Sequence, residues 1–285
     1  MNLDPNDKTP RDGTPLPMGK PAENHRIFAG IDIGSITAKA ALVRKYKDNT
    51  ISVAGTRVIP TGYDPAAAGE LVFSELLDQT GISREAVSGI VATGYGRNAV
   101  GFADKAMTEI ICHGAGAHFS APGVRGIIDV GGQDSKAIAL DAQGHVENFA
   151  MNDKCAAGTG RFLEVMAGAL ELGLEELGPI SLTADNPAGI SSICTVFAES
   201  EVISMIAGRE SRANIIAGIH EATAARVAGL AAKINIRTPV VMTGGVAKNI
   251  GLVKALEKRL GIEIRVNKLP QENGAVGAAV LAAGN

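Results

Sequence analysis

The sequence predicts an α/β fold built from two related halves. Along the 285 residues, segments with the composition of buried strands alternate with segments of helical patterning, which is the order typical of α/β proteins. The stretch GIDIGSITAKAAL places Asp32, Gly34 and Lys39 at and after the end of a strand, and a later stretch, IIDVGGQDSKAIAL, repeats these three residue types at the same spacing. Such a repeat indicates a duplicated domain with two matching turns.

The first half is expected to begin near residue 26, after a disordered tail. Residues 1–25 contain five of the twelve prolines and little that could be buried. Order begins with RIFAGIDIG, an apolar run that predicts a buried strand, and a hairpin continues through Lys39. The other elements of the predicted first domain, residues 26–120, are a strand in TISVAGTRVIP, a helix with Asp64 as its cap and Gly81 as its end, a strand in GIVATGYG and a helix in DKAMTEIICHGAGAHFSA.

The second half, residues 121–285, is expected to repeat this order and to add several helices. Its predicted elements are strands near 126–150, helices at about 156–170, 196–208 and 211–234, a strand in PVVMTGGV, a helix in AKNIGLVKALEKRLG, a short strand in EIRVN and a final helix in NGAVGAAVLAAG. Whether this final helix stays on the second domain, which carries the cysteines discussed below, or returns to the first is left open by the pattern.

Composition and charge exclude several classes of partner. The net charge is −3, aromatic residues make up 4% and tryptophan is absent, which argues against a surface for nucleic acid or for an anionic membrane. The apolar stretches fall well short of the roughly 20 residues that span a bilayer, and no secretory signal is recognisable. Three cysteines cannot form a disulfide framework, so we expect a cytoplasmic protein with neither nucleic acid nor membrane as partner.

Three glycine-containing turns follow predicted strands: DIGSIT at 32–37, DVGGQD at 129–134 and TGGVAKN at 243–249. Backbone N–H groups bind phosphate best where no side chain blocks the approach, so these turns favour a phosphate site, although one such turn alone is usually only a turn. An aspartate in each of the first two turns can hold a hydrated Mg²⁺ that bridges phosphates. The sequence contains neither GxxxxGK[ST] nor GxGxxG after a strand, which excludes P-loop and Rossmann sites.

Together the three turns resemble those of the sugar kinase, heat-shock 70 and actin superfamily. The resemblance covers about residues 26–285 and implies two duplicated ribonuclease-H-like domains, an actin-like ATPase fold, with ATP in an interdomain cleft. By this resemblance the phosphate-binding candidates are Gly34, Ser35, Thr37, Lys39, Gly131, Gly132 and Gln133, the residues that hold Mg²⁺ through water are Asp32 and Asp129, and those that face the nucleoside are Gly244, Gly245 and Asn249. Lys39 keeps a structural alternative, because its counterpart Lys136 is not obviously at a ligand.

Cys155 and Cys194 share an arrangement that suggests metal binding. Cys155 lies in NDKCAAGTGRF and Cys194 in SSICTVFAES, each at the expected start of a helix. A helix N-terminus favours a thiolate and the group that it ligates, whereas the ordinary interpretation of a lone cysteine is a small buried side chain. Two such cysteines are half of a Cys₄ site, and a twofold axis would supply the other half. Zinc also accepts four thiolates, so spacing alone leaves the metal open.

Four stretches resemble the ATPase family that energises 2-hydroxyacyl-CoA dehydratases and benzoyl-CoA reductases: MNDKCAAGTGRFLEVMA, SSICTVFAESEVISMIAG, IIAGIHEATAARVAGLA and VVMTGGVAKN. The resemblance implies an oxygen-sensitive dimer in which each protomer binds ATP and Mg²⁺, and in which Cys155 and Cys194 of both protomers hold one bridging [4Fe-4S] cluster. It also implies ATP-driven, low-potential single-electron transfer from ferredoxin or flavodoxin to a catalytic iron–sulfur acyl-CoA reductase or dehydratase component. It leaves open a homodimer or a paralogous heterodimer, and a dehydratase activator or a benzoyl-CoA reductase subunit.

Other interpretations stay open. Glu199 is a candidate for orienting the attacking water, and its alternative is a solvated helix face. Cys112 has two histidines nearby, but we interpret it as a helical thiol packed under the first domain. Two other functions are a small-molecule kinase of the same fold, which would make no use of Cys155 and Cys194, and a zinc-bridged nucleotide sensor.

Overall fold

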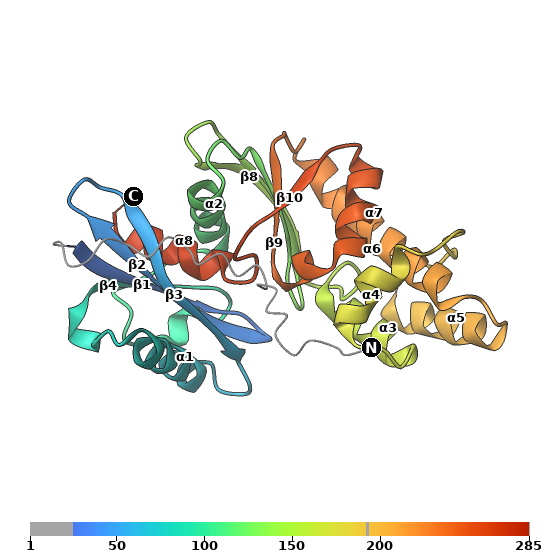
Figure 1. The fold of residues 1–285 in the computed structure, drawn as a ribbon, viewed down its shortest axis with the longest axis horizontal. Helices are drawn as coiled ribbons and strands as arrows, with labels where there is room; N and C mark the ends of the chain where they lie inside the picture. The colour runs from blue at the N-terminus through green and yellow to red at the C-terminus, as the bar shows by residue number, and fades with distance from the viewer. Residues whose placement is uncertain (1–24, 192–193, 285) are drawn as a thin grey trace, which may run out of the picture.

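The computed structural model describes residues 25–191 and 194–284 and contains two five-stranded sheets (Figure 1). The strand order is β3-β2-β1-β4-β5 in the first sheet and β8-β7-β6-β9-β10 in the second. In each sheet the first three strands in chain order form an antiparallel meander, and the other two run parallel to the first. The two sheets therefore have the same topology, and the predicted α/β fold with two related halves is confirmed.

The strands of the two sheets have these bounds. The first sheet contains β1 (His25–Ile33), β2 (Thr37–Tyr46), β3 (Ile51–Pro60), β4 (Val87–Thr93) and β5 (Lys105–Ala106). The second contains β6 (Gly126–Val130), β7 (Ser135–Leu140), β8 (Val146–Asn152), β9 (Val240–Thr243) and β10 (Ile264–Val266). The predicted tail, residues 1–25, lies outside the described residues except for His25, which begins β1.

The strand register explains the repeat in the sequence. Asp32 at the end of β1 pairs with Lys39 on β2, and Asp129 at the end of β6 pairs with Lys136 on β7. Each aspartate therefore lies at the carboxyl end of a central strand, immediately before a turn, with a lysine beside it on the returning strand. The repeated aspartate and lysine residues therefore occupy the same structural positions in both halves.

Two helices follow strands in the first half. Helix α1 (Pro65–Thr80) begins after Asp64, whose carboxylate accepts hydrogen bonds from two N–H groups of the first turn, and it ends at Gly81, whose φ is 65°. Both ends agree with the prediction. Helix α2 (Glu109–Ser120) begins later than predicted, because Lys105 and Ala106 instead form β5 beside β4. A strand of two residues is too short to give a periodic signal.

The second half adds helices that pack around its own core. They are α3 (Gly160–Ala169), α4 (Leu174–Ser181), α5 (Thr195–Ala207), α6 (Arg212–Lys233) and α7 (Ile250–Leu260); the short 3₁₀ helices of the molecule are η1 (Arg84–Ala86), η2 (Arg97–Ala99) and η3 (Gly245–Lys248). Helix α4 was not among the predicted elements, since it contains Pro179, a residue that usually breaks a helical pattern. Phe162, Leu163 and Met166 of α3 are fully buried in the shared core.

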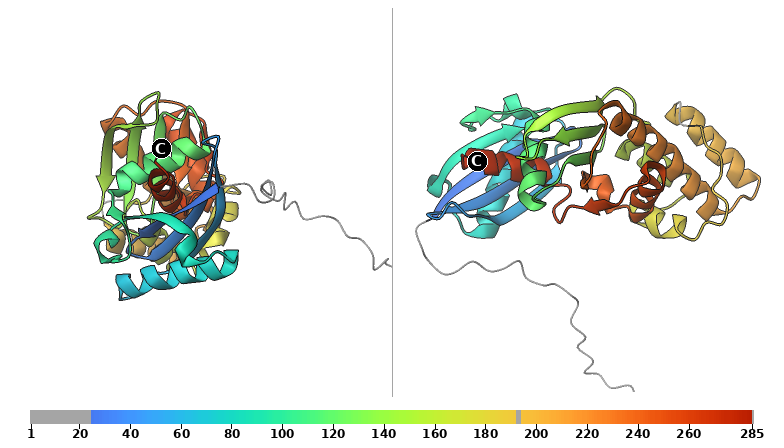
Figure 2. Two further views of the ribbon diagram at one scale, coloured as in Figure 1. Left: turned by 90° about the vertical axis from the view of Figure 1, so that its left-hand side faces the viewer. Right: turned by 90° about the horizontal axis from the view of Figure 1, so that it is seen from above.

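The last helix, α8 (Asn273–Ala282), packs on the first sheet (Figures 1 and 2). Its Val276, Ala279 and Val280 share a core cluster with Phe28 and Val43. Alternate residues of the same strands point to the opposite face, which α1 covers. The chain therefore passes to the second half after α2 and comes back before α8, and α2 packs against α8 where the halves meet.

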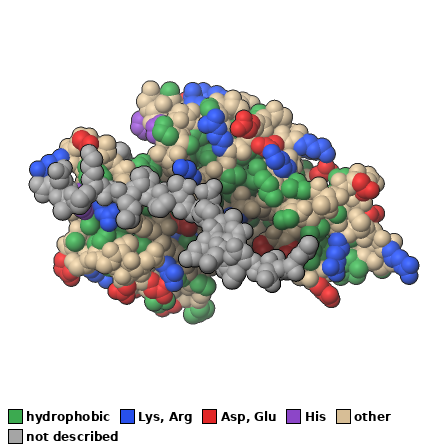
Figure 3. Space-filling model, in the orientation of Figure 1, with side chains coloured by type: hydrophobic (Ala, Val, Ile, Leu, Met, Phe, Trp, Pro, Cys, Tyr) green, Lys and Arg blue, Asp and Glu red, His purple; other side chains and the backbone are tan. Residues whose placement is uncertain are grey.

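The surface agrees with the modest net charge. Lysine, arginine, aspartate and glutamate side chains are interspersed over the face drawn in Figure 3. Within the described residues, every helix is too short or too polar to cross a membrane.

Candidate functional site

A cavity of about 870 Å³ lies between the two halves. It is lined by all twelve residues predicted to bind phosphates, Mg²⁺ or nucleoside, which are Asp32, Gly34, Ser35, Thr37, Lys39, Asp129, Gly131, Gly132, Gln133, Gly244, Gly245 and Asn249. The fold therefore brings together three turns that are far apart in the sequence. Glu199, Cys155 and Cys194 are not among its lining residues.

The first turn joins β1 to β2. The N–H of Gly34 donates to the carbonyl oxygen of Thr37 over 3.0 Å, and Lys39 Nζ lies 3.3 Å from Asp32 Oδ2. A Cβ atom at Gly34 would lie 3.0 Å from the Lys39 ammonium and 3.1 Å from the Thr37 carbonyl oxygen. Glycine at this position therefore leaves the approach to the turn free, as the phosphate hypothesis requires.

The second turn joins β6 to β7 and touches the first. The N–H of Gly131 donates to the carbonyl oxygen of Asp134 over 2.9 Å. Ile36 of the first turn packs so closely on Gly132 that a Cβ atom there would overlap it. Gln133 is exposed at the tip of the turn. The two Asp-x-Gly turns thus face each other across the cavity with contact at their edges.

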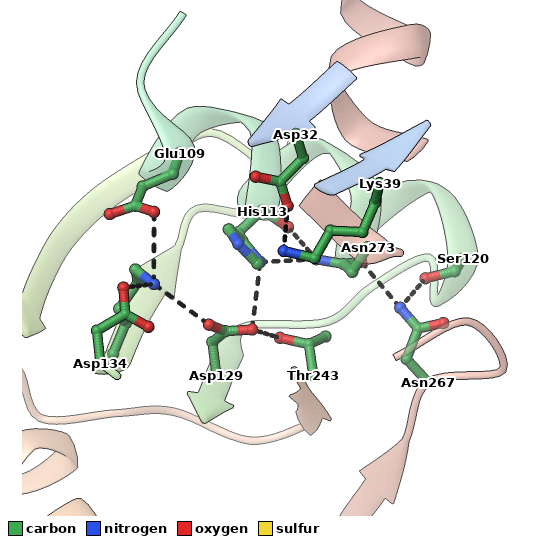
Figure 4. A network of polar contacts seen from close by, with 11 residues as sticks. Asp32, Lys39, Glu109, His113, Ser120, Asp129, Asp134, Thr243, Asn267 and Asn273 are labelled. Carbon is green, nitrogen blue, oxygen red and sulfur yellow. Dashed lines mark hydrogen bonds and ion pairs between the residues drawn. The ribbon is translucent and has the colours of Figure 1, made fainter. Parts of the chain in front are cut away.

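Asp129 lies at the centre of a buried polar network (Figure 4). Its carboxylate accepts a hydrogen bond from Thr243 Oγ1 over 2.7 Å and lies 3.4 Å from both Lys136 Nζ and His113 Nδ1. Burial by itself would raise the pKa of Asp129, but the neighbouring His113 and Lys136 charges and the hydrogen bonds from Thr243 and Lys136 outweigh burial and lower the pKa to about 2. Asp129 is therefore ionised at neutral pH, as a group that holds a divalent cation must be.

Lys136 is almost completely buried among three carboxylates. Its Nζ lies 2.8 Å from Asp134 Oδ2, 3.4 Å from Asp129 Oδ2 and 3.6 Å from Glu109 Oε2. Burial lowers the pKa of Lys136, yet the attraction of these carboxylates is larger and raises it above the ordinary value. The ammonium group is therefore a fixed positive charge beneath the second turn.

Helix α2 supplies two residues that the sequence patterns did not single out. Glu109 is its first residue and lines the cavity; burial raises the pKa of its carboxyl group, and the Lys136 charge offsets part of that rise. His113, one turn later, lies between Asp32 and Asp129 in Figure 4 and receives support from Asn273, whose Nδ2 lies 3.2 Å from His113 Nδ1. Their spacing of four residues places Glu109 and His113 on one face of the helix, but it does not indicate that this face meets the cavity.

The third turn follows β9. Gly244 has a φ of 85°, and its N–H donates to the Pro270 carbonyl oxygen over 2.7 Å. Asn249 caps α7 by accepting a hydrogen bond from the Leu252 N–H over 3.1 Å, while its Nδ2 lies 3.0 Å from His220 Nε2. Burial lowers the pKa of His220 to about 4, so the ring is neutral and Nε2 can accept this bond. Both ends of the Asn249 amide thus have partners within the protein.

The three cysteines have different surroundings. Cys112 is fully buried in α2, and burial raises its pKa to about 12, which confirms the interpretation as a packed, protonated thiol. Cys155 and Cys194 are half-buried free thiols. Cys194 is the N-cap residue of α5, at the start of a helix as predicted. The prediction for Cys155 is wrong, because α3 begins only at Gly160, after a turn at residues 156–159 that leaves Cys155 in a loop. Within residues 25–191 and 194–284, no group of three or more metal-type side chains is placed to bind a metal ion.

The fold and cavity define an actin-like ATPase, in which two sheets of the same topology enclose a nucleotide-sized cavity lined by paired Asp-x-Gly turns. A glucokinase of the ROK family from Streptomyces griseus shares this fold, with a TM-score of 0.53, 16% identity, and coverage of 91% of this chain and all of that one. The chain belongs to the BadF/BadG/BcrA/BcrD ATPase family, whose model matches residues 29–282.

Two relatives are much closer in sequence. The solved structure of the activator of the 2-hydroxyisocaproyl-CoA dehydratase from Clostridium difficile, with bound ADPNP, is 43% identical, has a TM-score of 0.83, and matches 91% of this chain and 94% of that chain. One of the subunits of benzoyl-CoA reductase from Thauera aromatica is 35% identical over 260 residues, which is 89% of this chain and 92% of that protein.

Proposed function

We propose that this chain is an ATP-hydrolysing iron–sulfur protein of the cytoplasm. It uses ATP to drive low-potential single-electron transfer from ferredoxin or flavodoxin to the catalytic component of an (R)-2-hydroxyacyl-CoA dehydratase or a benzoyl-CoA reductase. The observation that carries this proposal is the cavity in which Asp32 and Asp129, one from each sheet, meet three glycine turns. The similarity to a dehydratase activator solved with ADPNP supports the nucleotide, and the similarity to one of the subunits of a reductase keeps both partners in the proposal.

The charges of the cavity favour a nucleotide that arrives with a divalent cation. Seven carboxylates line it against three ammonium groups. The carboxylates belong to Asp32, Glu109, Asp129, Asp134, Asp153, Glu164 and Glu175, and the ammonium groups to Lys39, Lys136 and Lys248. This excess of negative charge repels a bare triphosphate but suits Mg²⁺, which prefers carboxylate and water oxygens. We assign the water-mediated cation contacts to Asp32 and Asp129. The backbone N–H groups of Gly34, Ser35, Thr37, Gly131 and Gly132, with Lys39 and Gln133, are assigned to the phosphates, and Gly244, Gly245 and Asn249 to the nucleoside side.

Glu109 is a better candidate than Glu199 for orienting the attacking water. Glu109 lines the cavity, and its raised pKa makes its carboxylate a stronger base than an exposed one. Glu199 is a half-buried residue of α5, a helix that contributes no lining residue to this cavity. We therefore transfer the catalytic role proposed for Glu199 to Glu109, which lies within reach of the buried Lys136 charge.

Cys155 and Cys194 suit a shared [4Fe-4S] cluster. Both are free, half-buried thiols, and Cys194 is the N-cap of α5, where a thiolate is favoured, whereas Cys155 lies in the loop that leads to α3. Two thiols from each of two chains make the Cys₄ donor set of such a cluster, and when bound the cluster supplies one-electron transfer at low potential. The role of this chain is to hold the thiols and to exclude solvent around them.

An exposed apolar face on α5 supports the dimer. Val196 and Phe197 are each 65% exposed, and Ile203 and Ile206 are also exposed. Exposed large apolar side chains along a helix favour contact with another protein surface, and Val196 and Phe197 lie within one helical turn of Cys194. A twofold axis at this face would bring the second pair of cysteines near the first, in a homodimer or a paralogous heterodimer.

Anaerobic purification tests the proposal as a whole. We expect a brown dimer with about four irons, set by the Cys₄ donor count, that hydrolyses MgATP. Cys155→Ala should remove the iron–sulfur absorbance and acceptor reduction while nucleotide binding remains. A colourless, iron-free monomer that binds ATP would overturn the electron-transfer function. Transfer of phosphate to a small molecule would instead indicate a kinase, and stoichiometric zinc a nucleotide sensor.

A further inference from the structure

The second glycine turn is hydrogen-bonded directly to the segment that follows Cys155. The N–H of Gly160 donates to the carbonyl oxygen of Gly131 over 2.8 Å, and the N–H of Arg161 donates to that of Gly132 over 2.7 Å. Both acceptors belong to the turn that lines the cavity. The first residues of α3 and this turn therefore form one hydrogen-bonded unit.

Gly160 lies where two of the three turns come together. A Cβ atom at Gly160 would lie 3.1 Å from the Gly131 carbonyl oxygen and 3.3 Å from Cγ2 of Val246. Val246 directly follows the Gly244–Gly245 turn. Such contacts leave little slack, so a displacement of either turn by a few tenths of an ångström also displaces the start of α3.

The residues between Cys155 and Gly160 leave no flexible gap. Ala157 is 1% exposed and Thr159 is completely buried. The Thr159 hydroxyl donates to the Ala156 carbonyl oxygen over 2.7 Å, and the Thr159 N–H donates to the same oxygen over 3.0 Å. A short, buried and internally bonded segment moves as a unit more readily than it bends.

Asn152 fixes the other end of this segment. Its Nδ2 donates to the Cys155 carbonyl oxygen over 2.8 Å and lies 3.3 Å from that of Ala157. Asn152 is the last residue of β8 and pairs with Ser135, the first residue of β7 after the second turn. The Cys155 loop is thus held at both ends by elements that border the same turn.

We propose that residues 152–161, the coupling segment, carry a nucleotide-dependent displacement of the second turn to Cys155, with Asn152 as the positioning residue that makes Cys155 move with the turn. This inference rests on the proposed nucleotide site and on Cys155 as a ligand. Cys194, the N-cap of α5, lies outside the coupling segment, and α5 packs on α3 and α6. Coupling between two binding sites is reciprocal. If nucleotide changes the affinity for the group at Cys155 by some factor, binding of that group changes the affinity for nucleotide by the same factor.

Hydrogen–deuterium exchange on the full chain tests the route without relying on the cluster. MgADPNP should slow amide exchange in the peptides that cover 131–134 and 153–161 of the unsubstituted protein. In Asn152→Ala and Asn152→Asp, neither of which can donate to the Cys155 carbonyl, we expect MgADPNP to bind and to protect 131–134, but to add no protection at 153–157. Asn148→Ala, an exposed asparagine on the same strand, is the matched control and should respond like the unsubstituted protein.

Iron extraction from the dimer tests the functional end of the route. MgADPNP should change the rate of iron removal by an added chelator by about tenfold, within the usual range of coupling between two sites. Asn152→Ala should make this rate independent of nucleotide. Gly160→Ala should reduce the response too, whereas Gly168→Ala, in the same helix but with open space around an added Cβ atom, should not.

The outcomes separate this inference from the proposed function. A full nucleotide response in both Asn152 variants would overturn the role of Asn152 and of the coupling segment. Nucleotide binding with no change in exchange at 153–161 in the unsubstituted protein would overturn the inference while the ATP site stands. Absence of bound iron, with the exchange response intact, would overturn the cluster and support the mechanical route.

Discussion

The two Asp–Lys pairs occupy the same register in the two sheets but differ in their surroundings. Lys39 lies beside Asp32 at 3.3 Å, and 13% of its side chain is exposed to the cavity. Lys136 is 2% exposed and lies among Asp129, Asp134 and Glu109. In the first copy, the position that corresponds to Asp134 is Thr37, which adds no charge. The duplication therefore placed the two Asp–Lys pairs at equivalent backbone positions, and the residues around each pair give the two lysines different roles.

This contrast indicates that the Lys39 ammonium group at the first turn can move, whereas the Lys136 ammonium group beneath the second turn is fixed. Lys39 can leave Asp32 and reach a phosphate oxygen, because one carboxylate holds it at a partly open site. Lys136 cannot be replaced as a counter-ion without leaving buried negative charge behind. Four experiments test this division, beginning with the largest expected effect.

Asp129→Asn should have the largest effect. The substitution removes the buried carboxylate proposed to hold Mg²⁺ and should cut MgATP turnover by about 10³-fold, comparable to the loss of a key electrostatic group in an active site. Steady-state hydrolysis over a range of Mg²⁺ concentrations measures this. Near-normal turnover would show that the second copy of the pair is structural only.

Glu109→Gln removes a group that has no counterpart in the first copy. Loss of a general base should lower kcat by about 10²-fold with little change in nucleotide affinity. Single-turnover hydrolysis, together with the dissociation constant for MgADPNP, separates the two quantities. Glu199→Gln is the control, and equal loss in both variants would contradict the assignment.

Replacing each lysine by methionine compares the pairs directly. Lys136→Met leaves three carboxylates without their shared cation and should reduce the free energy of unfolding by about 3–5 kcal/mol. Lys39→Met leaves only one carboxylate, that of Asp32, without its cation, so it should reduce stability by less than Lys136→Met and should raise KM for MgATP. Urea unfolding and steady-state kinetics measure the two effects. Similar stability losses for both lysines would show that they have the same role.

Acid pH should destabilise the fold by protonating Asp129 of the second Asp–Lys pair. Because its pKa is lowered from 3.8 to about 2, its ionised form stabilises the fold above about pH 4, and this contribution, about 2 kcal/mol, is lost as pH falls towards 2. The free energy of unfolding, measured with urea between pH 2 and pH 5, should therefore depend less steeply on pH in Asp129→Asn than in the unsubstituted protein. Identical slopes would mean that Asp129 is not stabilised by its neighbours.

Much of the fold could be predicted because its signals are local. The Asp64 cap and the Gly81 end of α1 act within a few residues, and the repeated hairpins place Asp32 and Asp129 in matching turns. Helix α4 and strand β5 were missed because one contains Pro179 and the other has only two residues. Periodicity cannot detect either element.

The sequence predicts some of the cavity residues but not others. The three glycine turns can be identified one at a time, and the fold assembles them. Glu109 and His113 reach the cavity only because α2 crosses from the first half to the second, which local sequence does not reveal. Glu199 does not line the cavity, because α5 contributes none of its lining residues. The packing of α5 away from the cavity depends on the tertiary fold, which local sequence does not reveal.

The return of α8 to the first sheet constrains how the protein is synthesised. Phe28, Ala41 and Val43 share their core cluster with residues near the carboxyl end of the chain, among them Val276 and Val280. While a ribosome is still translating the second half, this face of the emerging sheet lacks that cover and stays available for unwanted association. The first half, although its strands are made first, can complete its core only after α8 has been made.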